Sequence, residues 1–500
     1  MGTVGASDQV HFPAGTDPAT VDLVAGTSLP AVWAARWADE PQRPVLWDGP
    51  TGWLTAGELA RRTEVAAGRL YGAGLRKGDR VVLSAAPSID LVVAHVAALR
   101  LGLIVVPVNG AYQQGELAHI VGDAAPRAAV VDQPPWVRWL AELAPELLVV
   151  SPRLDLADAT ALSLDQLAGG DPALLGYTSG TTGAPKGAVL THANLLAGAR
   201  SVGIAWRWTP EDRLVLALPL FHMHGLGVGL HGTLLAGASA VLVPGFSPDA
   251  VLDAAQAHDA TLFFGVPTMY SRLAQSPRVA GLSRLRLCVS GSAPLPADLH
   301  HRLGQKAGVR VLERYGMTET IMLVSNPYDG ERRAGTVGFP LPGVELRLAP
   351  ETGEVQVRGP NVFPGYWRRP EATAAAFDAD GWFRTGDLGA FDSDGYLVLQ
   401  GRATELVISG GLNVYPREVE DALRSHPDVE DVAVTGTPDD EWGELVTAWV
   451  VAAGKDAPTL EQLRHHLDGV CAPFKHPRIL HLVGELPRNA LGKVQKHLLA

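Results

Sequence analysis

Tyr177-Thr-Ser-Gly-Thr-Thr-Gly-Ala-Pro-Lys-Gly187 follows a short apolar segment, Ala173–Tyr177, that is expected to form a buried strand. Glycines let a backbone approach an oxyanion closely, hydroxyl groups donate hydrogen bonds to it, and Lys186 adds positive charge. A Walker A loop has its lysine followed by Ser or Thr, whereas here Gly187 follows Lys186. Composition alone would also fit a flexible surface loop. Phosphate binding is therefore a hypothesis that depends on the rest of the chain.

Helix and strand patterns alternate on both sides of this stretch. Thr55-Ala-Gly-Glu58 has the form of a capping box and is expected to open an amphipathic helix towards Gly72. Buried strands are expected at 80–84, 104–108 and 260–264, with helices ending near Leu99 and His258. Strands that alternate with helices predict right-handed βαβ units and mostly parallel sheet.

The pattern changes near Gly335. Short alternating segments between Gly- and Pro-rich turns predict a small β-subdomain over about 335–400. A new α+β unit follows, with helices expected at 416–424 and 460–467 and strands at 429–435 and 445–451. The predicted domains are a loose N-terminal arm (1–28), a large α/β domain of αβα layers that includes the β-subdomain (29–401), and a small mobile C-terminal α+β domain (402–500).

Six segments in a fixed order resemble the adenylate-forming superfamily, which includes acyl-CoA synthetases, luciferases and peptide-synthetase adenylation domains. They are Thr178–Gly187, Pro219-Leu-Phe-His222, Ser290-Gly-Ser-Ala-Pro294, Glu313-Arg-Tyr-Gly-Met-Thr-Glu319, Arg384-Thr-Gly-Asp387 with Gly401-Arg402, and Pro487-Arg-Asn-Ala-Leu-Gly-Lys493. The resemblance covers roughly residues 30–500. It implies an enzyme that joins a carboxylic acid to ATP as an acyl-adenylate and then transfers the acyl group to a thiol, with Mg²⁺, ATP and coenzyme A taking part.

The same resemblance assigns roles residue by residue. Lys493, Thr318, Glu319 and His222 are expected to be catalytic, and Glu319 and Thr178 are expected to hold Mg²⁺, for which hard oxygen ligands are suited. Tyr315 is expected to stack on adenine, and Asp387 to accept both ribose hydroxyls. The full set expected to bind nucleotide or CoA is Thr178, Ser179, Gly180, Thr181, Thr182, Gly183, Lys186, Ser290, Gly291, Ser292, Ala293, Pro294, Glu313, Tyr315, Gly316, Met317, Asp387, Arg402, Gly410 and Gly411.

The acid pocket carries a narrower resemblance. Phe263-Phe-Gly-Val-Pro-Thr-Met-Tyr-Ser-Arg272, together with Ser290–Pro294 and Glu313–Thr320, is similar to malonyl-CoA synthetases. That likeness implies that Arg272 and Arg314 grip the distal carboxylate of malonate, beside His222, by forked hydrogen bonds. Arg272→Ala is therefore expected to weaken malonate use by about 2–5 kcal/mol, the usual cost of unpairing a buried charge. Methylmalonate is a further expected substrate.

Two positions depart from the family pattern. Thr320-Ile-Met-Leu-Val-Ser325 is more apolar than the malonyl-CoA synthetase version, and Thr404 stands where the family usually has Asp or Lys. The C-terminal domain is nevertheless expected to rotate about residues 403–405 between the two half-reactions, which withdraws Lys493 and opens a channel for pantetheine past Gly410 and Gly411. Alternatives remain open: a ligase for a small monocarboxylic or aromatic acid, an enzyme that loads a carrier protein or an amine, or a catalytically inactive binding module.

Composition limits the other classes of function. The 500-residue chain is 47% hydrophobic and carries a formal charge of −12, which disfavours nucleic-acid binding. Cys288 and Cys471 have no CxxC spacing, so neither a disulfide framework nor a zinc site is expected.

No signal peptide is recognisable, and the uncharged stretch 214–248 contains histidines and prolines that favour a buried strand–helix–strand passage over a membrane span. A cytoplasmic enzyme without membrane partners is predicted. The GxGxxG match at Gly227–Gly232 is interpreted as close helix packing.

Overall fold

The computed structural model describes residues 10–160, 164–178, 185–409, 412–439, 442–454, 456–468, 470–489 and 492–499. The chain divides into two compact units. The first runs to Glu345 and also takes in Val357–Phe383, and the second comprises Leu346–Gln356 and the chain from Arg384 onwards. This partition differs from the predicted boundary near 401, but a unit defined by contacts need not be a unit that moves. The hinge at 403–405 therefore stays a prediction.

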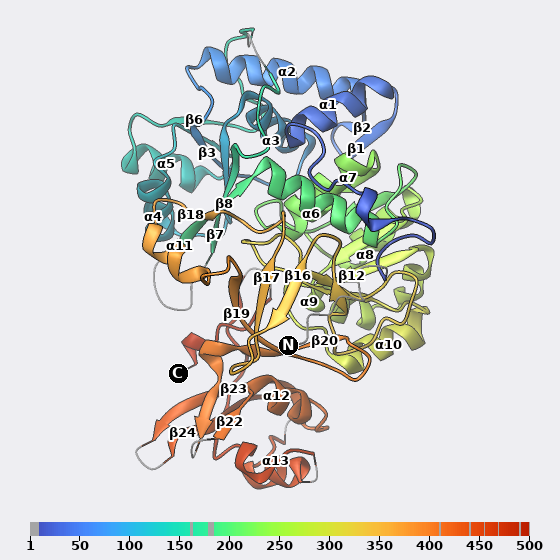
Figure 1. Ribbon diagram of the computed structural model, residues 1–500, viewed down its shortest axis with the longest axis vertical. Helices are drawn as coiled ribbons and strands as arrows, with labels where there is room; N and C mark the ends of the chain where they lie inside the picture. Colours follow the sequence, from blue (N-terminus) through green and yellow to red (C-terminus); the bar gives the residue numbers. More distant parts are fainter. Residues whose placement is uncertain are drawn as a thin grey trace. The chain divides into compact units, whose positions relative to one another are not determined.

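Two sheets form the framework of the first unit (Figure 1). The nine-stranded sheet has the order β15 (Phe339–Pro340), β14 (Val324–Ser325), β13 (Leu312–Tyr315), β12 (Leu287–Ser290), β11 (Leu262–Gly265), β9 (Arg213–Leu216), β10 (Ser239–Leu242), β1 (Pro44–Asp48) and β2 (Gly52–Thr55). The seven-stranded sheet has the order β18 (Gly365–Tyr366), β8 (Lys186–Thr191), β7 (Pro172–Thr178), β4 (Ile104–Pro107), β3 (Arg80–Ser84), β5 (Ala128–Val131) and β6 (Leu148–Val150). Six neighbouring strands of the first sheet, β13 to β1, and five of the second, β7 to β6, run parallel.

Helices cover and separate these sheets. They are α1 (Leu29–Asp39), α2 (Ala56–Gly72), α3 (Ile89–Leu101), α4 (Gln114–Ala124), α5 (Pro134–Leu143), α6 (His192–Ala205), the π-helix η2 (His224–Leu230), α7 (His231–Ala236), α8 (Pro248–Ala257), α9 (Pro267–Gln275), α10 (Ala297–Ala307) and α11 (Pro370–Ala376). The mostly apolar α3 contacts β1 of one sheet and β4 of the other, so it lies between the sheets, as a helix with apolar residues on most of its surface should. The mostly parallel αβα layering predicted from the sequence is confirmed.

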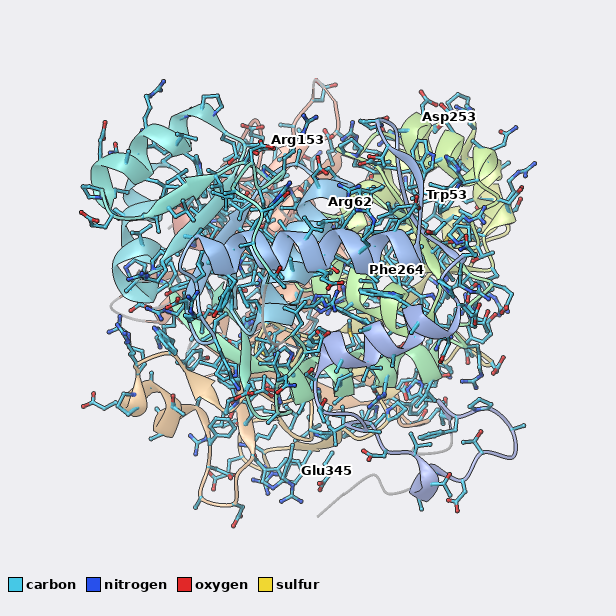
Figure 2. All side chains as sticks on the ribbon, turned by 90° about the horizontal axis from the view of Figure 1, so that it is seen from above. Trp53, Arg62, Arg153, Asp253, Phe264 and Glu345 are labelled. Carbon is cyan, nitrogen blue, oxygen red and sulfur yellow. The ribbon has the colours of Figure 1, made fainter. Side chains whose placement is uncertain are left out.

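Local sequence features set several of these elements. Thr55 caps α2 through the predicted capping box with Glu58. Figure 2 shows α2 crossing the first unit, with Arg62 on it; Arg62 and Arg153 both pair with Asp90 at the start of α3, at 2.5 and 3.5 Å. These ion pairs join α2, α3 and the segment after β6.

Part of the predicted N-terminal arm contacts the first unit, at His11 and Phe12. The ring of His11 is buried and lies 3.1 Å from the carbonyl oxygen of Phe339, and Arg207 donates to the carbonyl oxygens of His11 and Phe12. A short segment without periodicity can thus be held at single buried side chains, while residues 13–27 are exposed or half-buried. The arm as a separate region stays a prediction.

The uncharged stretch 214–248 forms β9, η2, α7 and β10, as predicted. Its glycines allow close packing: a Cβ atom at Gly229 would lie 2.9 Å from Leu216 Cδ1, and one at Gly232 would lie 2.7 Å from the Trp208 ring. The GxGxxG match is thus a packing feature. Within the described residues, none of the helices is long and apolar enough to cross a bilayer.

The second unit contains two smaller sheets. A four-stranded sheet has the order β16 (Glu345–Leu348), β17 (Glu354–Arg358), β19 (Phe383–Phe391) and β20 (Leu397–Arg402). A five-stranded sheet has the order β22 (Leu412–Val414), β21 (Val407–Ser409), β24 (Gly443–Ala452) and β23 (Val429–Asp439), and β25 (Ile479–Leu482) pairs in parallel with β24. Helices α12 (Pro416–Arg424) and α13 (Leu460–Leu467) contribute Val419, Leu423, Leu463 and Leu467 to its core.

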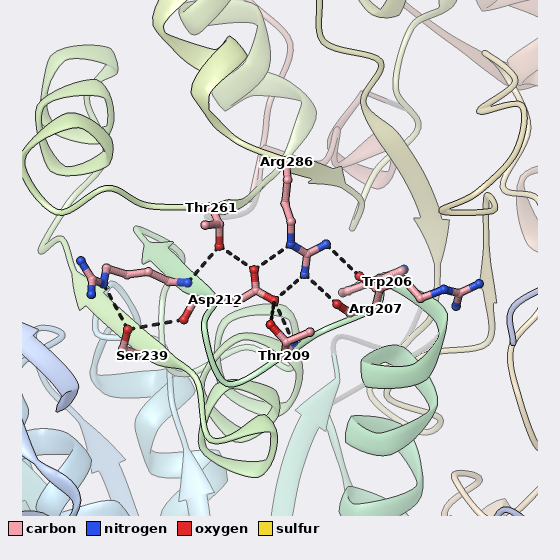
Figure 3. A network of polar contacts seen from close by, with 8 residues as sticks. Trp206, Arg207, Thr209, Asp212, Ser239, Thr261 and Arg286 are labelled. Atoms are coloured by element: carbon pink, nitrogen blue, oxygen red, sulfur yellow. Dashed lines mark hydrogen bonds and ion pairs between the residues drawn. The ribbon is translucent and has the colours of Figure 1, made fainter. Parts of the chain in front are cut away.

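An ion pair between a buried carboxylate and a half-buried guanidinium connects the amino ends of three parallel strands. Asp212, just before β9, accepts from Arg286 Nε at 2.7 Å and from its Nη2 at 2.5 Å, and also from Thr261 at 2.7 Å (Figure 3). Burial acts to raise the pKa of Asp212, but the hydrogen bonds from Arg286 outweigh it and leave that pKa below its usual value. The pair therefore joins the segments that precede β9, β11 and β12.

Replacing Asp212 with alanine is expected to lower the free energy of unfolding by about 1.5–3 kcal/mol, because the hydrogen bonds that the buried carboxylate accepts from the half-buried Arg286 would be lost. Asp253→Ala is the matched control, since Asp253 and its partner Arg278 are exposed and such pairs contribute about 0–1 kcal/mol. Chemical unfolding of both variants measures the difference. Equal losses would contradict the assigned importance of the Asp212–Arg286 pair.

Candidate functional site

The carboxyl ends of β11, β12 and β13 lie side by side in the first unit. Gly265 pairs with Ser290, and Ser290 pairs with Glu313, so the residues that follow these strands leave the sheet at one edge. Ligands of open α/β sheets bind outside the carboxyl ends of the strands. Three of the predicted binding segments begin at this edge.

The first of them, Ser290–Pro294, is held against β13. Leu295 N donates to Glu313 Oε1 at 2.9 Å, and Ser292 has a left-handed backbone with φ of 70°. A Cβ atom at Gly291 would lie 2.4 Å from Cζ of the Arg314 guanidinium. Glycine is therefore required at 291 for the arginine to lie where it does.

Arg314 is a buried cation. Its side chain is 4% exposed, and within the described residues its Nε and Nη2 atoms have no hydrogen-bond partner. Burial lowers its pKa to about 9, which still leaves it charged at neutral pH. The neighbouring Glu313 carboxylate acts to raise this pKa but does not satisfy Nε and Nη2. Buried guanidinium N–H groups without an acceptor are costly, so this side chain is suited to a negatively charged ligand.

Two histidines lie near Arg314. Burial and Arg314 together lower the pKa of His222 to about 4 and that of His224 well below 6.5. His224 N donates to His222 Nδ1 at 3.2 Å, and Ser292 Oγ lies 3.4 Å from His224 Nδ1. Both rings are neutral at pH 7 and offer hydrogen bonds without adding charge. His224 was not among the sequence-predicted residues, although the His222-Met-His224 spacing was a possible signal.

Arg272 is placed differently. Its side chain is exposed on α9, with its guanidinium 5.3 Å from the centre of the Phe246 ring, and it is not among the charges that shift the pKa of Arg314. The described residues provide it with no ion pair. The two arginines are therefore not brought together by any contact in this structure, and the premise of a buried Arg272 is not met.

The turn after β13 lies on β7. A Cβ atom at Gly316 would lie 2.7 Å from the carbonyl oxygen of Ile321, so only glycine fits the turn. A Cβ atom at Gly176 of β7 would lie 2.4 Å from the methyl carbon of Thr318. Thr318 thus packs on the strand that leads into the Thr178–Gly187 segment.

Gly176→Ala is expected to displace Thr318 and to slow adenylate formation about 100-fold, the scale of loss for a misplacement of about 1 Å. ATP–pyrophosphate exchange measures this rate. Gly304→Ala is the control, because a Cβ atom at Gly304 would meet nothing within 4 Å. Unchanged exchange in Gly176→Ala would show that Thr318 needs no fixed position.

Glu319 accepts a hydrogen bond from Tyr366, a residue that the sequence did not suggest. Tyr366 Oη donates to Glu319 Oε1 at 3.0 Å, and Lys186 Nζ lies 5.5 Å from the centre of the Tyr366 ring. Tyr366 belongs to β18, which pairs with β8. The sequence placed it in the β-subdomain because a single aromatic residue in a Gly- and Pro-rich stretch gives no signal of long-range pairing.

Part of the predicted phosphate loop lies outside the described residues, namely Ser179–Ala184. Its flanks are described: Thr178 pairs with Lys186, and Tyr177 with Gly187, in the β7–β8 ladder. No group of three His, Cys, Asp or Glu side chains suited to a metal occurs in the part of the chain that the structure describes. A Mg²⁺ ion at Glu319 would fit only with phosphate and water oxygens as its other ligands, which is its usual mode with nucleotides.

In the second unit, Asp387 and Arg402 face each other across β19 and β20. Arg402 Nε lies 2.8 Å from Asp387 Oδ1, and Arg402 Nη1 donates to the carbonyl oxygen of Thr385 at 3.0 Å. The Lys493 side chain is exposed, but desolvation by the surrounding chain and the Arg402 charge lower its pKa, while Glu405 and Asp387 act in the opposite direction. The tail lysine therefore lies within electrostatic reach of Asp387 and Arg402. Gly410 and Gly411 fall outside the described residues.

A separate cavity of about 940 Å³ opens at the carboxyl ends of β3, β4 and β5. Its lining combines aromatic rings with polar groups, among them Ser84, Asn109, Gln133, Trp136 and Phe221. Phe221 directly precedes His222 in the chain, so this cavity adjoins the segment of the buried histidines.

Comparisons with known proteins agree with this arrangement. Residues 33–367 match the AMP-binding enzyme family, and residues 418–493 match the AMP-binding enzyme C-terminal domain. A feruloyl-CoA synthase of an Amycolatopsis species is 38% identical over 480 residues, which cover 93% of this chain and 97% of that protein. A malonate–CoA ligase of Arabidopsis thaliana is 35% identical over 474 residues, 85% of this chain and 78% of that protein.

The crystal structure of ATP-bound MatB from Rhodopseudomonas palustris superposes with a TM-score of 0.89 at 40% identity, and the match covers 94% of this chain and 98% of that one. With its site at the carboxyl edge of parallel strands and both domains matched, the chain belongs to the AMP-binding enzyme family and is an acid–CoA ligase.

Proposed function

We propose that this ligase activates a small acid that carries a second acidic group, with malonate the first candidate and methylmalonate the next. The observation that carries this proposal is Arg314, a buried guanidinium whose Nε and Nη2 lack partners in the described structure. A distal carboxylate would supply the missing acceptors through forked hydrogen bonds. His222 and His224, both neutral, would leave the positive charge to the arginine.

The first half-reaction joins the acid to ATP and releases pyrophosphate. In this proposal the acid's reacting carboxylate attacks the α-phosphate, which Thr318 contacts, while Lys493 offsets the negative charge that builds up between the two groups. Tyr315 holds adenine, and Asp387 holds the ribose hydroxyls. Magnesium held by Glu319 and Thr178 would supply further charge neutralisation when bound.

The second half-reaction transfers the acyl group to a thiol. The C-terminal domain is proposed to turn about residues 403–405, so that Lys493 leaves and the pantetheine arm reaches the mixed anhydride past Gly410 and Gly411. The thiolate attacks the acyl carbon, and AMP leaves. The cavity that adjoins Phe221 supports CoA itself as the acceptor, because its volume of about 940 Å³ is large enough for a nucleotide, which a carrier protein would not need.

A second candidate, a ligase for an aromatic monocarboxylic acid, is favoured by the similarity to feruloyl-CoA synthase. The apolar segment 320–325 was a further reason to consider it. In the structure, however, Ile321 packs against Gly198 and Gly227, and Met322 and Leu323 are buried. These side chains are used in packing, which weakens the argument from composition.

One panel tests both candidates. ATP–pyrophosphate exchange is measured with malonate, methylmalonate, acetate, butyrate, benzoate and ferulate, and the products formed with CoA are identified by mass. Malonate is expected to give the highest kcat/KM and a malonyl-CoA product. Preference for ferulate or benzoate would overturn the proposed acid, and exchange without a CoA product would overturn the proposed acceptor. Absence of exchange with every acid would favour an inactive binding module. A cytoplasmic location is proposed as well, to be tested by fractionation.

A further inference from the structure

Helix α4 contacts both ends of the proposed phosphate loop. Tyr177 Oη donates to Asp123 Oδ2 at 2.7 Å, at the end of β7, and His119 Nε2 lies 2.8 Å from the carbonyl oxygen of Pro185, just before β8. His119 and Asp123 are four residues apart on α4 and therefore lie on one face of the helix. One helix face thus holds the chain where it enters the loop and where it leaves.

Each of the two contacts has a defined donor. A carbonyl oxygen can only accept, so the His119 Nε2 atom carries the hydrogen. Burial and the Asp123 carboxylate raise the pKa of Tyr177, which keeps the phenol protonated and donating. Hydrogen bonds to a carboxylate are stronger than neutral ones. The His119 and Tyr177 rings also meet edge to face, with centres 6.4 Å apart.

The Asp123 carboxylate also binds the neighbouring segment. Arg369 Nη2 donates to Asp123 Oδ1 at 2.9 Å, and Trp367 N donates to the carbonyl oxygen of Gly187 at 2.7 Å. Asp123 therefore connects the start of the loop with the segment that follows β18. Tyr366 of β18 in turn donates to Glu319, the proposed metal ligand.

We propose that α4 is a clamp that sets the position of the phosphate loop for ATP, with His119 and Asp123 as its positioning residues. The proposal rests on the proposed function of the loop. The β7–β8 ladder pairs the two loop ends with each other, and α4 connects that pair to a helix of the α/β domain through side chains at both ends. Side chains that fix Tyr177 and Pro185 set where the chain enters and leaves the loop, and such preorganisation favours ATP binding although the clamp does not touch the nucleotide.

The test separates ATP binding from acid binding and from the second half-reaction. His119→Leu removes the donor, and is expected to raise KM for ATP about tenfold in ATP–pyrophosphate exchange, the effect of losing one hydrogen bond. KM for the acid, and the rate of thioester formation from preformed acyl-adenylate and CoA, should stay within about twofold. His119→Gln retains an N–H group and should recover KM for ATP to within about threefold of the natural protein. Tyr177→Phe should behave like His119→Leu.

His11→Leu is the matched control. His11 also places its Nε2 atom 3.1 Å from a backbone carbonyl oxygen, that of Phe339, but far along the chain from the loop. Both leucine variants should lower the melting temperature, and only His119→Leu should change KM for ATP. The clamp is refuted if His119→Leu leaves KM for ATP within twofold, if His11→Leu raises it equally, or if both half-reactions fall together. If the natural protein is active and the variants give these refuting results, the clamp is wrong but the proposed function remains. If the natural protein shows neither ATP–pyrophosphate exchange nor ATP binding, both the clamp and the proposed function are overturned.

Discussion

Lys493→Ala is expected to reduce ATP–pyrophosphate exchange by about 100- to 1,000-fold, while thioester formation from preformed acyl-adenylate and CoA stays nearly intact. The physical reason is that a charge placed at the attacking carboxylate and the α-phosphate matters most where negative charge develops, which occurs only in the first half-reaction. The position of Lys493 near Asp387 and Arg402 supports a role beside the proposed ribose ligands.

Lys496→Ala provides the comparison for Lys493→Ala. Lys496 lies three residues further on, and its ammonium group is 2.7 Å from Glu420 and 3.2 Å from Glu405. Its loss should weaken the attachment of the tail and lower both half-reactions in parallel. Equal losses in the two half-reactions of Lys493→Ala would show that Lys493 also serves only to hold the tail.

Arg314→Met is expected to lower kcat/KM for malonate by about 30- to 1,000-fold, the range for losing a desolvated charge partner. Activity with acetate or butyrate should be unchanged or higher, because these acids have no second carboxylate to lose. Steady-state kinetics with the three acids measures the change in preference. Arg272→Met is the second variant, and its effect should be smaller, because Arg272 is exposed and stacked on Phe246.

Unfolding measurements distinguish a substrate role for Arg314 from a structural one. The described residues give its Nε and Nη2 atoms no partner, so removing the buried charge should leave the free energy of unfolding unchanged or raise it. Malonate should stabilise the natural protein against heat and have little effect on Arg314→Met. A strongly destabilised Arg314→Met that keeps its preference for malonate would assign the arginine to the core instead.

The fold was predictable because its signals are local. A capping box predicted α2, and apolar strand segments that alternate with helices predicted parallel sheets, all of which depend on neighbouring residues. The six motifs could be found because each is a short contiguous stretch. The match of both family domains confirms the assignment that they suggested.

Long-range contacts were the part that the sequence could not supply. Tyr366 reaches Glu319 only because β18 pairs with β8, and His119 meets Pro185 across 66 positions. The sequence also did not show which side chains are buried. Arg272 and Arg314 are the same residue type, yet Arg272 is exposed and Arg314 is only 4% exposed. The environment of a side chain depends on how distant segments pack together, which the periodicity of a sequence does not predict.

The Asp212–Arg286 pair has a consequence for how such ligases could acquire new substrates. It secures β9, β11 and β12 at their amino ends, while two of the segments that resemble malonyl-CoA synthetases, 263–272 and 290–294, continue beyond the opposite ends of β11 and β12. Substitutions in those segments leave the fastened end untouched, so acid preference can drift, or be engineered by exchanging two short stretches, without rebuilding the framework that carries them.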